Sequence, residues 1–382
     1  MGHRMSAFDC VIVGGGIVGA ALAESLSTEG MSVALVEARS IGTATTACGM
    51  GHLVAMDDNA AELALTAYSV SLWRQLSQGL PRTVEYDACG TLWLAADDEE
   101  MAAVSAKVAN YRAAGVRAEV LDAAALYEAE PSLAPGLVGA LRVPDDAVLY
   151  PPVAARTFAQ RAQARGAKVM TGCLVRELRP EGVVLANGEV LKAGRVVLAA
   201  GVASPSLCPE LPISPRKGHL LITRRGAPVV HHQLVELGYL KSAHGTDGAS
   251  VAFNAQPRVT GQLLLGSSRQ PGEASREVEA SILERMLKRA AMFLPGLDGL
   301  QALRVWTGLR PASPDGLPLL GAHPEKPWLW LACGHEGLGI TTATGSARLV
   351  ADQMLGRVSA IDVAAYSPSR FLGGAAREVA HA

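Results

Sequence analysis

The feature that most constrains this chain is a glycine-rich turn between an apolar run and a helical pattern. Residues 8–13 (FDCVIV) are typical of a buried parallel strand. The turn GGGIVG (14–19) follows at once, and alanine-rich helical sequence continues to about Thr28. Residues 32–37 (SVALVE) predict the next strand. This order of strand, turn, helix and strand predicts a doubly wound α/β unit.

Each spaced glycine of the turn has its own physical role. Gly14 permits the tight turn, Gly16 lets the backbone approach a pyrophosphate, and Gly19 lets helix and strand pack closely. The helix N-terminus adds free N–H groups and partial positive charge. Glu37 ends the next strand, where a carboxylate accepts hydrogen bonds from a ribose diol and repels the 2′-phosphate of NADP. The turn therefore predicts a dinucleotide site; the alternative is a plain turn beside a solvated glutamate.

Composition sets the remaining limits. The chain has 382 residues, which suits two domains, and 49% hydrophobic with 18% charged residues excludes disorder as its main state. A net charge of -2 with 4% aromatic residues argues against nucleic acid as the main partner. No apolar run is long enough to span a membrane. The six cysteines form no C-x-x-C pair, so we expect free thiols, no metal site and a cytoplasmic location.

The order of patterns along the chain predicts two interleaved domains. Parallel α/β signatures occur at the beginning, in the middle and at the end, and antiparallel strand patterns lie between them. We therefore expect an α/β (α+β) fold, with a Rossmann-like cofactor domain interleaved with an antiparallel-sheet substrate domain. The predicted bounds are 5–80, 147–214 and 306–366 for the cofactor domain, 81–146 and 215–305 for the substrate domain, and 367–382 for a C-terminal tail.

Three later segments are candidates for chemistry. The buried strand pattern RVVLAA (195–200) ends at Gly201, a small-residue end that lets backbone pass close to a dinucleotide. In the segment 308–321, prolines stiffen the chain around Arg310, whose guanidinium suits bidentate capture of a carboxylate. A structural ion pair with Asp315 is an equal alternative for Arg310. The glycine-bearing loop 334–339 leads into a helix whose N-terminus can stabilise an anion.

Together and in this order, these elements resemble the D-amino-acid oxidase and glycine oxidase superfamily of FAD enzymes, from about Phe8 to Tyr366. The resemblance implies that the glycine turn and Glu37 bind the ADP half of FAD, that Val175 contacts adenine, and that the GHxxxGI loop lies beside the flavin. Arg310 matches the family's G-[LF]-R-P arginine, which binds the substrate carboxylate. The implied cofactor-binding residues are Gly14, Gly16, Ile17, Val18, Gly19, Glu37, Ala38, Thr46, Gly51, Val175, Ala200, Gly201, Gly334, His335, Gly337, Leu338, Gly339 and Ile340. A buried structural role for His335 is an equal alternative.

A closer resemblance lies in three short segments, ACGMGH (47–52), RKGH (216–219) and HHQLVELGYLK (231–241). They look like the FAD subunits of bacterial D-hydroxyproline dehydrogenase and hydrogen cyanide synthase. The resemblance implies iron–sulfur and flavin partner subunits in a hetero-oligomer, either cytoplasmic or peripheral at the inner face of the membrane. Because this chain has no C-x-x-C cluster, an iron–sulfur centre would belong to a partner.

The chain departs from the oxidases of this superfamily at two places. Asn254 stands where glycine oxidase has an active-site tyrosine, and the cysteine that holds the flavin of monomeric sarcosine oxidase near Arg310 is absent. Non-covalent FAD is therefore expected, and direct use of oxygen is in doubt.

The resemblance implies hydride transfer from the substrate's Cα to flavin N5, with Arg310 holding the carboxylate. His52, beside the Gly-Met-Gly turn, is a candidate for assisting deprotonation, and Asn254 is a third candidate catalytic residue; fold roles for both stay open. The first hypothesis is an FAD-dependent dehydrogenase of a D-amino or cyclic imino acid, with D-hydroxyproline as the best guess, that passes electrons to a partner subunit or a quinone-type acceptor. The alternatives are a glycine- or sarcosine-type oxidase that uses O2, and a non-catalytic flavin-binding subunit.

Overall fold

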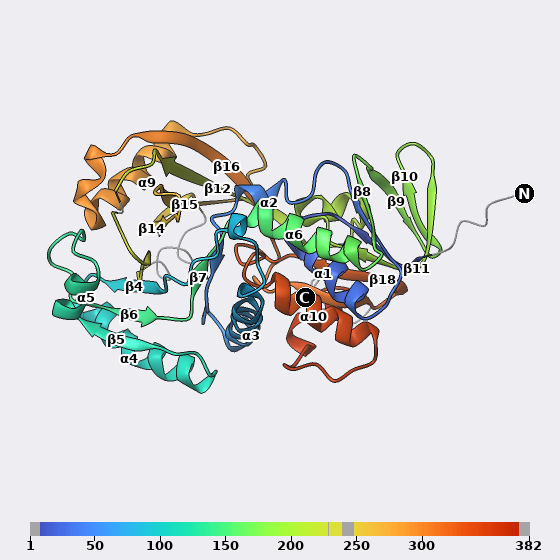
Figure 1. The fold of residues 1–382 in the computed structure, drawn as a ribbon, viewed down its shortest axis with the longest axis horizontal. Coiled ribbons are helices and arrows are strands. Elements are labelled where there is room, and N and C mark those ends of the chain that lie inside the picture. The colour runs from blue at the N-terminus through green and yellow to red at the C-terminus, as the bar shows by residue number, and fades with distance from the viewer. Residues whose placement is uncertain (1–7, 228, 239–247, 374–382) are drawn as a thin grey trace, which may run out of the picture. The chain divides into compact units, whose positions relative to one another are not determined.

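The structure, a computed structural model, describes residues 8–227, 229–238 and 248–373 (Figure 1). The chain divides into two compact units, each made of segments distant in the sequence. The first unit comprises Met1–Gly49, Pro151–Ser214 and Arg310–Ala382, and the second comprises Met50–Tyr150 and Pro215–Leu309. The predicted α/β class is confirmed, because each unit is built on a multi-stranded sheet that carries helices.

The first unit contains a mainly parallel sheet. Its strands follow the order β17 (Leu319–His323), β18 (Lys326–Cys333), β11 (Val190–Leu198), β1 (Phe8–Val13), β2 (Val33–Glu37) and β8 (Lys168–Thr171). Every neighbouring pair is parallel except β17 with β18. The apolar runs predicted as buried strands are buried here from Cys10 to Val13 and from Val33 to Val36, as expected for a parallel sheet between two layers.

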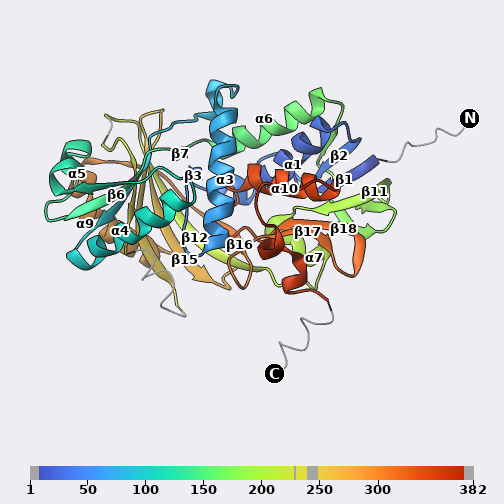
Figure 2. The same ribbon diagram turned by 90° about the horizontal axis from the view of Figure 1, so that it is seen from below.

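Helices and a β-meander supply those two layers of the first unit. Helix α1 (Ile17–Thr28) packs against α6 (Pro151–Ala164) and α10 (Ala343–Met354), and the three run side by side in Figure 2. The strands β9 (Val175–Arg179) and β10 (Gly182–Leu185) form an antiparallel meander with β11. Apolar side chains of the meander and the sheet form one buried cluster. The small residues of α1 are buried, which permits its close packing.

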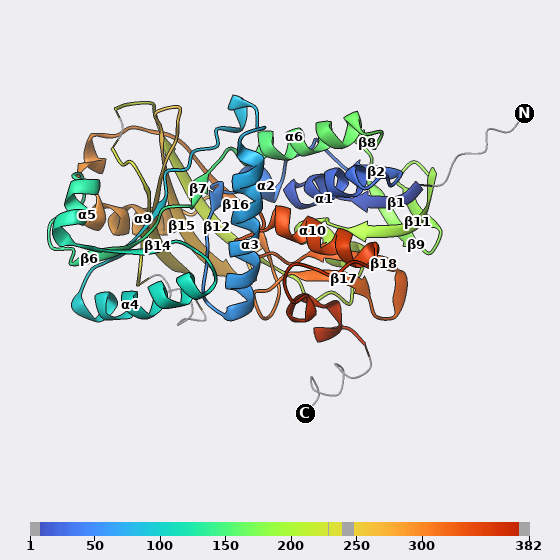
Figure 3. The ribbon, with the colours of Figure 1, turned by 60° about the horizontal axis from the view of Figure 1, so that its bottom comes forward.

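The second unit contains a larger, mostly antiparallel sheet. Its strand order is β16 (Ala302–Ala312), β12 (Ser214–Thr223), β15 (Leu263–Pro271), β14 (Ser250–Pro257), β13 (Gln233–Glu236), β4 (Thr91–Ala95), β6 (Gly139–Val143) and β5 (Glu119–Asp122). The β13–β4 pair is parallel. One face of the sheet carries the core of this unit, and helix α9 (Ala280–Phe293) packs on β14 and β15 there (Figure 3).

Among its described residues, the second unit has three further α-helices, α3 (Ala60–Ser77), α4 (Asp98–Ala113) and α5 (Ala123–Ala129). Asn59, Asp97 and Asp122 accept hydrogen bonds from N–H groups of the first turns of these helices. Such caps satisfy donors that have no partner within the helix. A two-stranded ribbon joins β3 (His52–Leu53) to β7 (Ala147–Val148). Strands β3, β5, β6, β7, β13, β16 and β17 were not predicted, because short, glycine-bearing or proline-bearing strands give weak patterns.

Two predicted domain bounds need correction. Residues 50–80 were expected in the cofactor domain, but they belong to the second unit. The reason is local bonding: β3 pairs with β7, the Ala55 N–H donates to Asp146, and the Met56 N–H donates to Thr66 of α3. The predicted tail also begins too early. Arg370 forms an ion pair with Asp315, and Leu372 is buried in the first unit.

Candidate functional site

The glycine turn of the first unit is shaped by close backbone contacts. Gly14 has φ +112°, and a Cβ on it would overlap the carbonyl oxygen of Ala199 at the end of β11. A Cβ on Gly19 would overlap the carbonyl oxygen of Gly14. Both positions therefore require glycine, for the reasons predicted from the spacing. The Gly14 N–H donates to the carbonyl of Val36, which anchors the turn against β2.

The start of α1 leaves backbone donors at this turn. The Ile17 N–H donates to Thr46 Oγ1 at 3.0 Å, so the predicted cofactor residue Thr46 caps the helix from a separate segment. The first intrahelical bond runs from the Ala20 N–H to the Gly16 carbonyl. The N–H groups of Val18 and Gly19 precede that bond, and donors at a helix start favour an anion such as a phosphate.

Glu37 reaches the glycine turn from the end of β2. Its Oε2 accepts the Gly15 N–H at 2.7 Å, and its Oε1 accepts the Arg39 N–H at 2.7 Å. One bond comes from the glycine turn and the other from the residue after Ala38, and together they hold the carboxylate beside the turn. Each carboxylate oxygen has a further lone pair, so Glu37 retains the capacity to accept bonds from ribose hydroxyls.

Other predicted cofactor residues lie in the same unit. Val175 begins β9, and its side chain is buried in the apolar cluster, which leaves its backbone as the contacting group. Ala200 and Gly201 follow β11 directly, and Gly201 has φ +57°. The neighbouring Ala199 N–H donates to the carbonyl of Val13, so this strand end lies against the glycine turn.

The structure brings Arg310 next to the loop 334–340. A Cβ on Gly337 would lie 3.7 Å from both Cδ and Nε of Arg310, an ordinary contact distance, so the arginine side chain lies directly beside Gly337. Ala312 bridges to His335, and the Glu336 N–H donates to the carbonyl of Pro311. At the other end of the loop, Ile340 lies against Gly49. Arg310 lies near the end of strand β16, so the stretch that was expected to be stiffened by prolines is a strand there.

His335 is a buried residue of this loop. Its Nε2 hydrogen-bonds to Ser346 Oγ of α10 at 3.0 Å, and the side chain is buried. Burial lowers the pKa of His335 to about 4, so the imidazole is neutral at physiological pH. This bond ties the loop to α10 and supports the structural alternative for the imidazole. The backbone of His335 and of its neighbours Leu338 and Gly339 remains the predicted cofactor contact.

Three predicted site residues belong to the second unit. Gly51 has φ +97° and accepts the Leu149 N–H, and His52 pairs with Val148 in the β3–β7 ribbon. Burial, with repulsion from Arg258, lowers the pKa of His52 to about 3. A base this weak argues against the predicted role of His52 in deprotonation. Asn254 lies on β14.

Sequence reasoning missed a group of buried polar residues in the second unit, Thr91, Asp146, Gln233 and Gln256. The available signal was the spacing: polar residues alternate with the core residues of β4, β13 and β14. Asp146 Oδ1 accepts the Ala55 N–H at 3.0 Å. Burial raises the pKa of Asp146 to about 8, against hydrogen bonds from Thr91 and Ala55 that lower it.

We expect Asp146→Asn to stabilise the protein increasingly as pH rises from about 4 to 8. The folded-state pKa lies above the unfolded value, so the stabilisation from the neutral acid is present at low pH and is lost as pH rises through about 8. A tenfold difference in proton affinity between the folded and unfolded states corresponds to about 1.4 kcal/mol of stability. Asparagine carries no proton to lose and keeps an oxygen for Ala55. Denaturant unfolding at a series of pH values measures the effect.

The matched control for that prediction is Asp145→Asn. Asp145 is adjacent but partly exposed, and it forms ion pairs with Arg74 and Arg117. The difference in unfolding free energy between Asp145→Asn and the unchanged protein should therefore not grow as pH rises. Parallel pH-stability curves for Asp146→Asn and the unchanged protein would contradict the burial argument.

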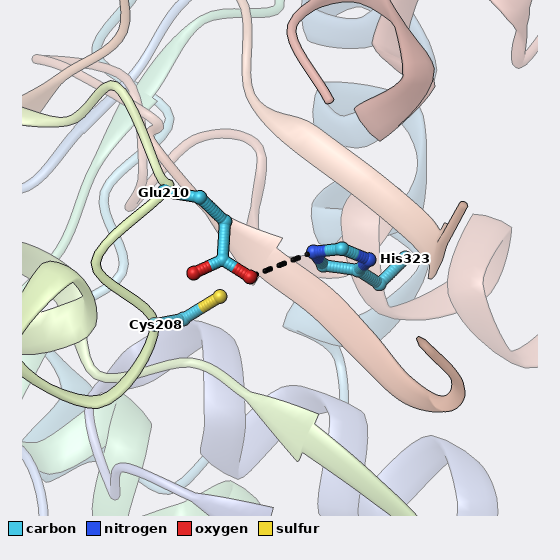
Figure 4. Close-up of side chains that lie close together, drawn as sticks. All are labelled: Cys208, Glu210 and His323. Carbon is cyan, nitrogen blue, oxygen red and sulfur yellow. Dashed lines mark hydrogen bonds and ion pairs between the residues drawn. The ribbon is translucent and has the colours of Figure 1, made fainter. Parts of the chain in front are cut away.

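A second polar cluster, Cys208, Glu210 and His323, has metal-ligand chemistry (Figure 4). Its ligand atoms lie within 4.8 Å of one another. The Glu325 N–H donates to His323 Nδ1, so Nε2 carries the proton and donates to Glu210 at 3.2 Å. A metal at Nε2 would require a proton on Nδ1, where that N–H already points.

The remaining partners of this cluster also oppose a metal. Lys326 forms an ion pair with Glu210, and burial raises the pKa of the Cys208 thiol to about 12, whereas metals bind the thiolate. The cluster is therefore an ion-pair network that joins the segment after α7 (Ser204–Leu207) to β17 and β18. Within the described residues, no helix is long and apolar enough to cross a membrane.

Comparisons with known proteins agree with this geometry. The model of the DAO family, described as FAD dependent oxidoreductase, matches residues 9–353. The crystal structure of glycine oxidase from Geobacillus kaustophilus is 28% identical, with a TM-score of 0.85 over 96% of this chain and 100% of that one. A D-amino acid dehydrogenase of Methylobacterium nodulans is 36% identical over 68% of this chain and 62% of its own length. Hydrogen cyanide synthase subunit HcnC of Pseudomonas aeruginosa is 26% identical over 95% and 96%.

Proposed function

The chain belongs to the DAO family of FAD dependent oxidoreductases, and we propose that it oxidises the Cα–N bond of an amino or imino acid held through its carboxylate by Arg310. The expected superfamily and the expected cofactor, FAD, are confirmed by the family match. The relatives of known activity oxidise amino acids, which confirms the class of enzyme. The substrate, the electron acceptor and the roles of single residues are proposals.

The residues of the first unit fit FAD. The turn at Gly14 and Gly19 has no room for side chains, and backbone donors at the start of α1 suit a pyrophosphate. Glu37 is held beside that turn with lone pairs to spare for ribose hydroxyls. We propose that these residues bind the ADP half non-covalently and that the loop 334–340 borders the flavin.

The position of Arg310 beside that loop is the observation that carries the proposal. Arg310 packs across Gly337, and the bridge between Ala312 and His335 holds the two segments together. Asp315, the alternative partner considered for Arg310, forms an ion pair with Arg370 through Nε at 2.9 Å. A guanidinium at such a place suits the planar carboxylate of an amino acid.

Bound FAD would supply the two-electron acceptor for this oxidation. The protein's own contribution is orientation: Arg310 fixes the carboxylate and so sets which face of Cα is presented. The substrate amine must be neutral before oxidation, and the low pKa of His52 argues against this imidazole as the base.

The comparisons favour a glycine-type substrate over the predicted D-hydroxyproline. Glycine oxidases align over nearly the whole chain at 28–30% identity, whereas no comparison specifically supports hydroxyproline. D-Hydroxyproline and other D-amino acids stay as proposed substrates through the 36% identical D-amino acid dehydrogenase. An oxidase of glycine or sarcosine type is therefore the second candidate.

Anaerobic bleaching of the bound flavin tests the proposed function. The purified holoenzyme is mixed with glycine, sarcosine and both enantiomers of alanine, serine, proline and hydroxyproline. Loss of flavin absorbance with at least one of them is expected, and free FAD should be released on denaturation. Failure of the whole panel, with FAD bound, would support the non-catalytic flavin subunit instead.

We expect an artificial dye to accept electrons faster than oxygen does. Asn254 replaces the tyrosine of glycine oxidase, and two of the relatives are a dehydrogenase and a synthase subunit. Initial rates of dye reduction and of peroxide formation, measured on one preparation with the best substrate, give the ratio. Peroxide produced as fast as dye is reduced would establish the glycine-type oxidase.

We propose partner subunits on the basis of the same relatives. The relative HcnC is named as a subunit, which supports the proposal that this chain passes electrons to an iron–sulfur or flavin partner. The cytoplasm is its proposed location. The segment 231–241 that suggested this likeness falls partly outside the described residues, since 239–247 are not described.

A further inference from the structure

The backbone of the first unit joins the end of strand β16 to the loop 334–340. Ala312 forms an antiparallel bridge with His335, and the Glu336 N–H donates to the Pro311 carbonyl at 2.9 Å. The proposed carboxylate-binding arginine directly precedes these two linked residues on the strand. A displacement of the loop would therefore displace the backbone next to that arginine.

The loop keeps a shape that its own backbone disfavours. Glu336 has a left-handed conformation with φ +46°. Residues other than glycine rarely adopt this conformation, and they keep it only where the surrounding structure holds them there. The turn is also narrow, because a Cβ on Gly339 would lie 3.2 Å from Cβ of His335. The loop therefore needs contacts that hold it in place.

The buried side chain of His335 supplies one of these contacts. It is 4% exposed, and its Nε2 hydrogen-bonds at 3.0 Å to Oγ of Ser346, which is 1% exposed. Ser346 is fixed in turn on α10, where its N–H donates to the Thr342 carbonyl at 2.8 Å. The side-chain bond therefore fastens the loop to a helix of the same unit.

Stability alone does not explain a polar pair at this contact. Replacing both partners of a buried hydrogen bond by apolar groups of the same shape is often nearly neutral for stability. Such a bond adds specificity, because it is satisfied in one relative arrangement of the two segments that it joins. The polar pair of His335 and Ser346 therefore indicates a need for a fixed loop position.

We propose that Ser346 is a positioning residue of the substrate site: through His335 it holds the loop against the end of β16, and so it sets where Arg310 presents its guanidinium. This inference rests on the proposed function. Without the hydroxyl, Nε2 of His335 would lose its partner on α10, and the loop would shift until this atom reached another partner or water. The linked end of β16 would follow. Because bidentate capture of a carboxylate tolerates little misplacement, the substrate should bind more weakly.

The first test is Ser346→Ala in the FAD-loaded protein. The substrate concentration that half-bleaches the flavin, measured with the best amino acid of the panel, should rise about tenfold or more; tenfold corresponds to about 1.4 kcal/mol. Amide hydrogen exchange of residues 335–339, measured by mass spectrometry without substrate, should become faster, because local opening of the loop sets this rate. Ser346→Thr keeps the hydroxyl and should restore both values toward those of the unchanged protein.

A double-mutant cycle tests whether Ser346 acts through His335. His335→Phe removes the ring nitrogens and keeps an aromatic ring in the buried space. If the hydroxyl acts through the imidazole, the protein with both substitutions should have a half-bleaching concentration within about twofold of the weaker-binding single variant. Independent effects of the two residues would multiply instead.

Ser27→Ala is the matched control. Ser27 is also buried on a helix of the first unit, but its Oγ donates to the Ala23 carbonyl of its own helix at 2.6 Å. Its substitution should leave the half-bleaching concentration and the exchange of residues 335–339 unchanged. Melting temperatures of both alanine variants show how much stability each substitution removes.

Three results would overturn the inference. They are an unchanged half-bleaching concentration in Ser346→Ala, an equal rise of that concentration in Ser27→Ala, and multiplying effects of Ser346→Ala and His335→Phe. Failure of the proposed function looks different, because no amino acid of the panel would then bleach the flavin of the unchanged holoenzyme.

Discussion

A Gly14→Ala protein is expected to lose its FAD and much of its stability. Gly14 has φ +112°, which an L-residue with a Cβ rarely adopts, and the new methyl group would overlap the Ala199 carbonyl oxygen. Backbone strain of this kind costs about 1–3 kcal/mol before the overlap is counted. To relieve it, the end of β11 must move away from the turn, and the backbone donors at α1 then lose their positions.

The matched control for this prediction is Gly30→Ala. Gly30 also has a positive φ, +82°, but a Cβ there would meet no heavy atom within 4 Å. An alanine at position 30 would therefore introduce backbone strain without steric overlap, and it would do so away from the glycine turn. Flavin-to-protein absorbance ratios and melting temperatures are measured for both variants. Equal FAD occupancy in the two would show that the close contact at Gly14 is not needed for binding.

The cofactor half of the site could be predicted because its signals are local. The strand, the glycine turn, the helix and Glu37 are contiguous in sequence, and each contact that they make in the structure follows from that order. The helical sequence after the glycine turn likewise forms α1, which ends at Thr28 as expected. The glycine turn and its contacts could therefore be predicted from one contiguous stretch of sequence.

The buried polar residues of the second unit could not be predicted in the same way, because strand register is not local. Thr91, Gln233 and Gln256 come from distant parts of the chain and meet only through the pairing of β4, β13 and β14. Arg310 illustrates a different difficulty. The prolines after it indicated a stiff stretch but no strand, whereas β16 is at the end of the strand order, and an edge strand tolerates proline.

Replacing Arg310 with leucine should abolish turnover and leave FAD bound. A carboxylate in a desolvated site needs a charged bidentate partner, and loss of that partner costs about 2–5 kcal/mol, roughly thirty- to several-thousand-fold in apparent affinity. The chemical step should also slow, because a misplaced carboxylate turns Cα away from its productive orientation. Arg310→Lys should recover only part of the activity, since an ammonium cannot copy the planar guanidinium.

Arg370→Leu provides the structural comparison for Arg310. Arg370 holds Asp315 and the carbonyls of residues 317 and 318, so its loss should lower the melting temperature and leave substrate affinity intact in the folded fraction. Arg310→Leu should show the reverse: an unchanged flavin content, a small change in melting temperature, and no bleaching at substrate concentrations that bleach the unchanged enzyme. Because the two arginines belong to the same unit, the pair separates a carboxylate-binding arginine from one that stabilises the fold. Normal bleaching by Arg310→Leu would remove the carboxylate-binding role from this residue.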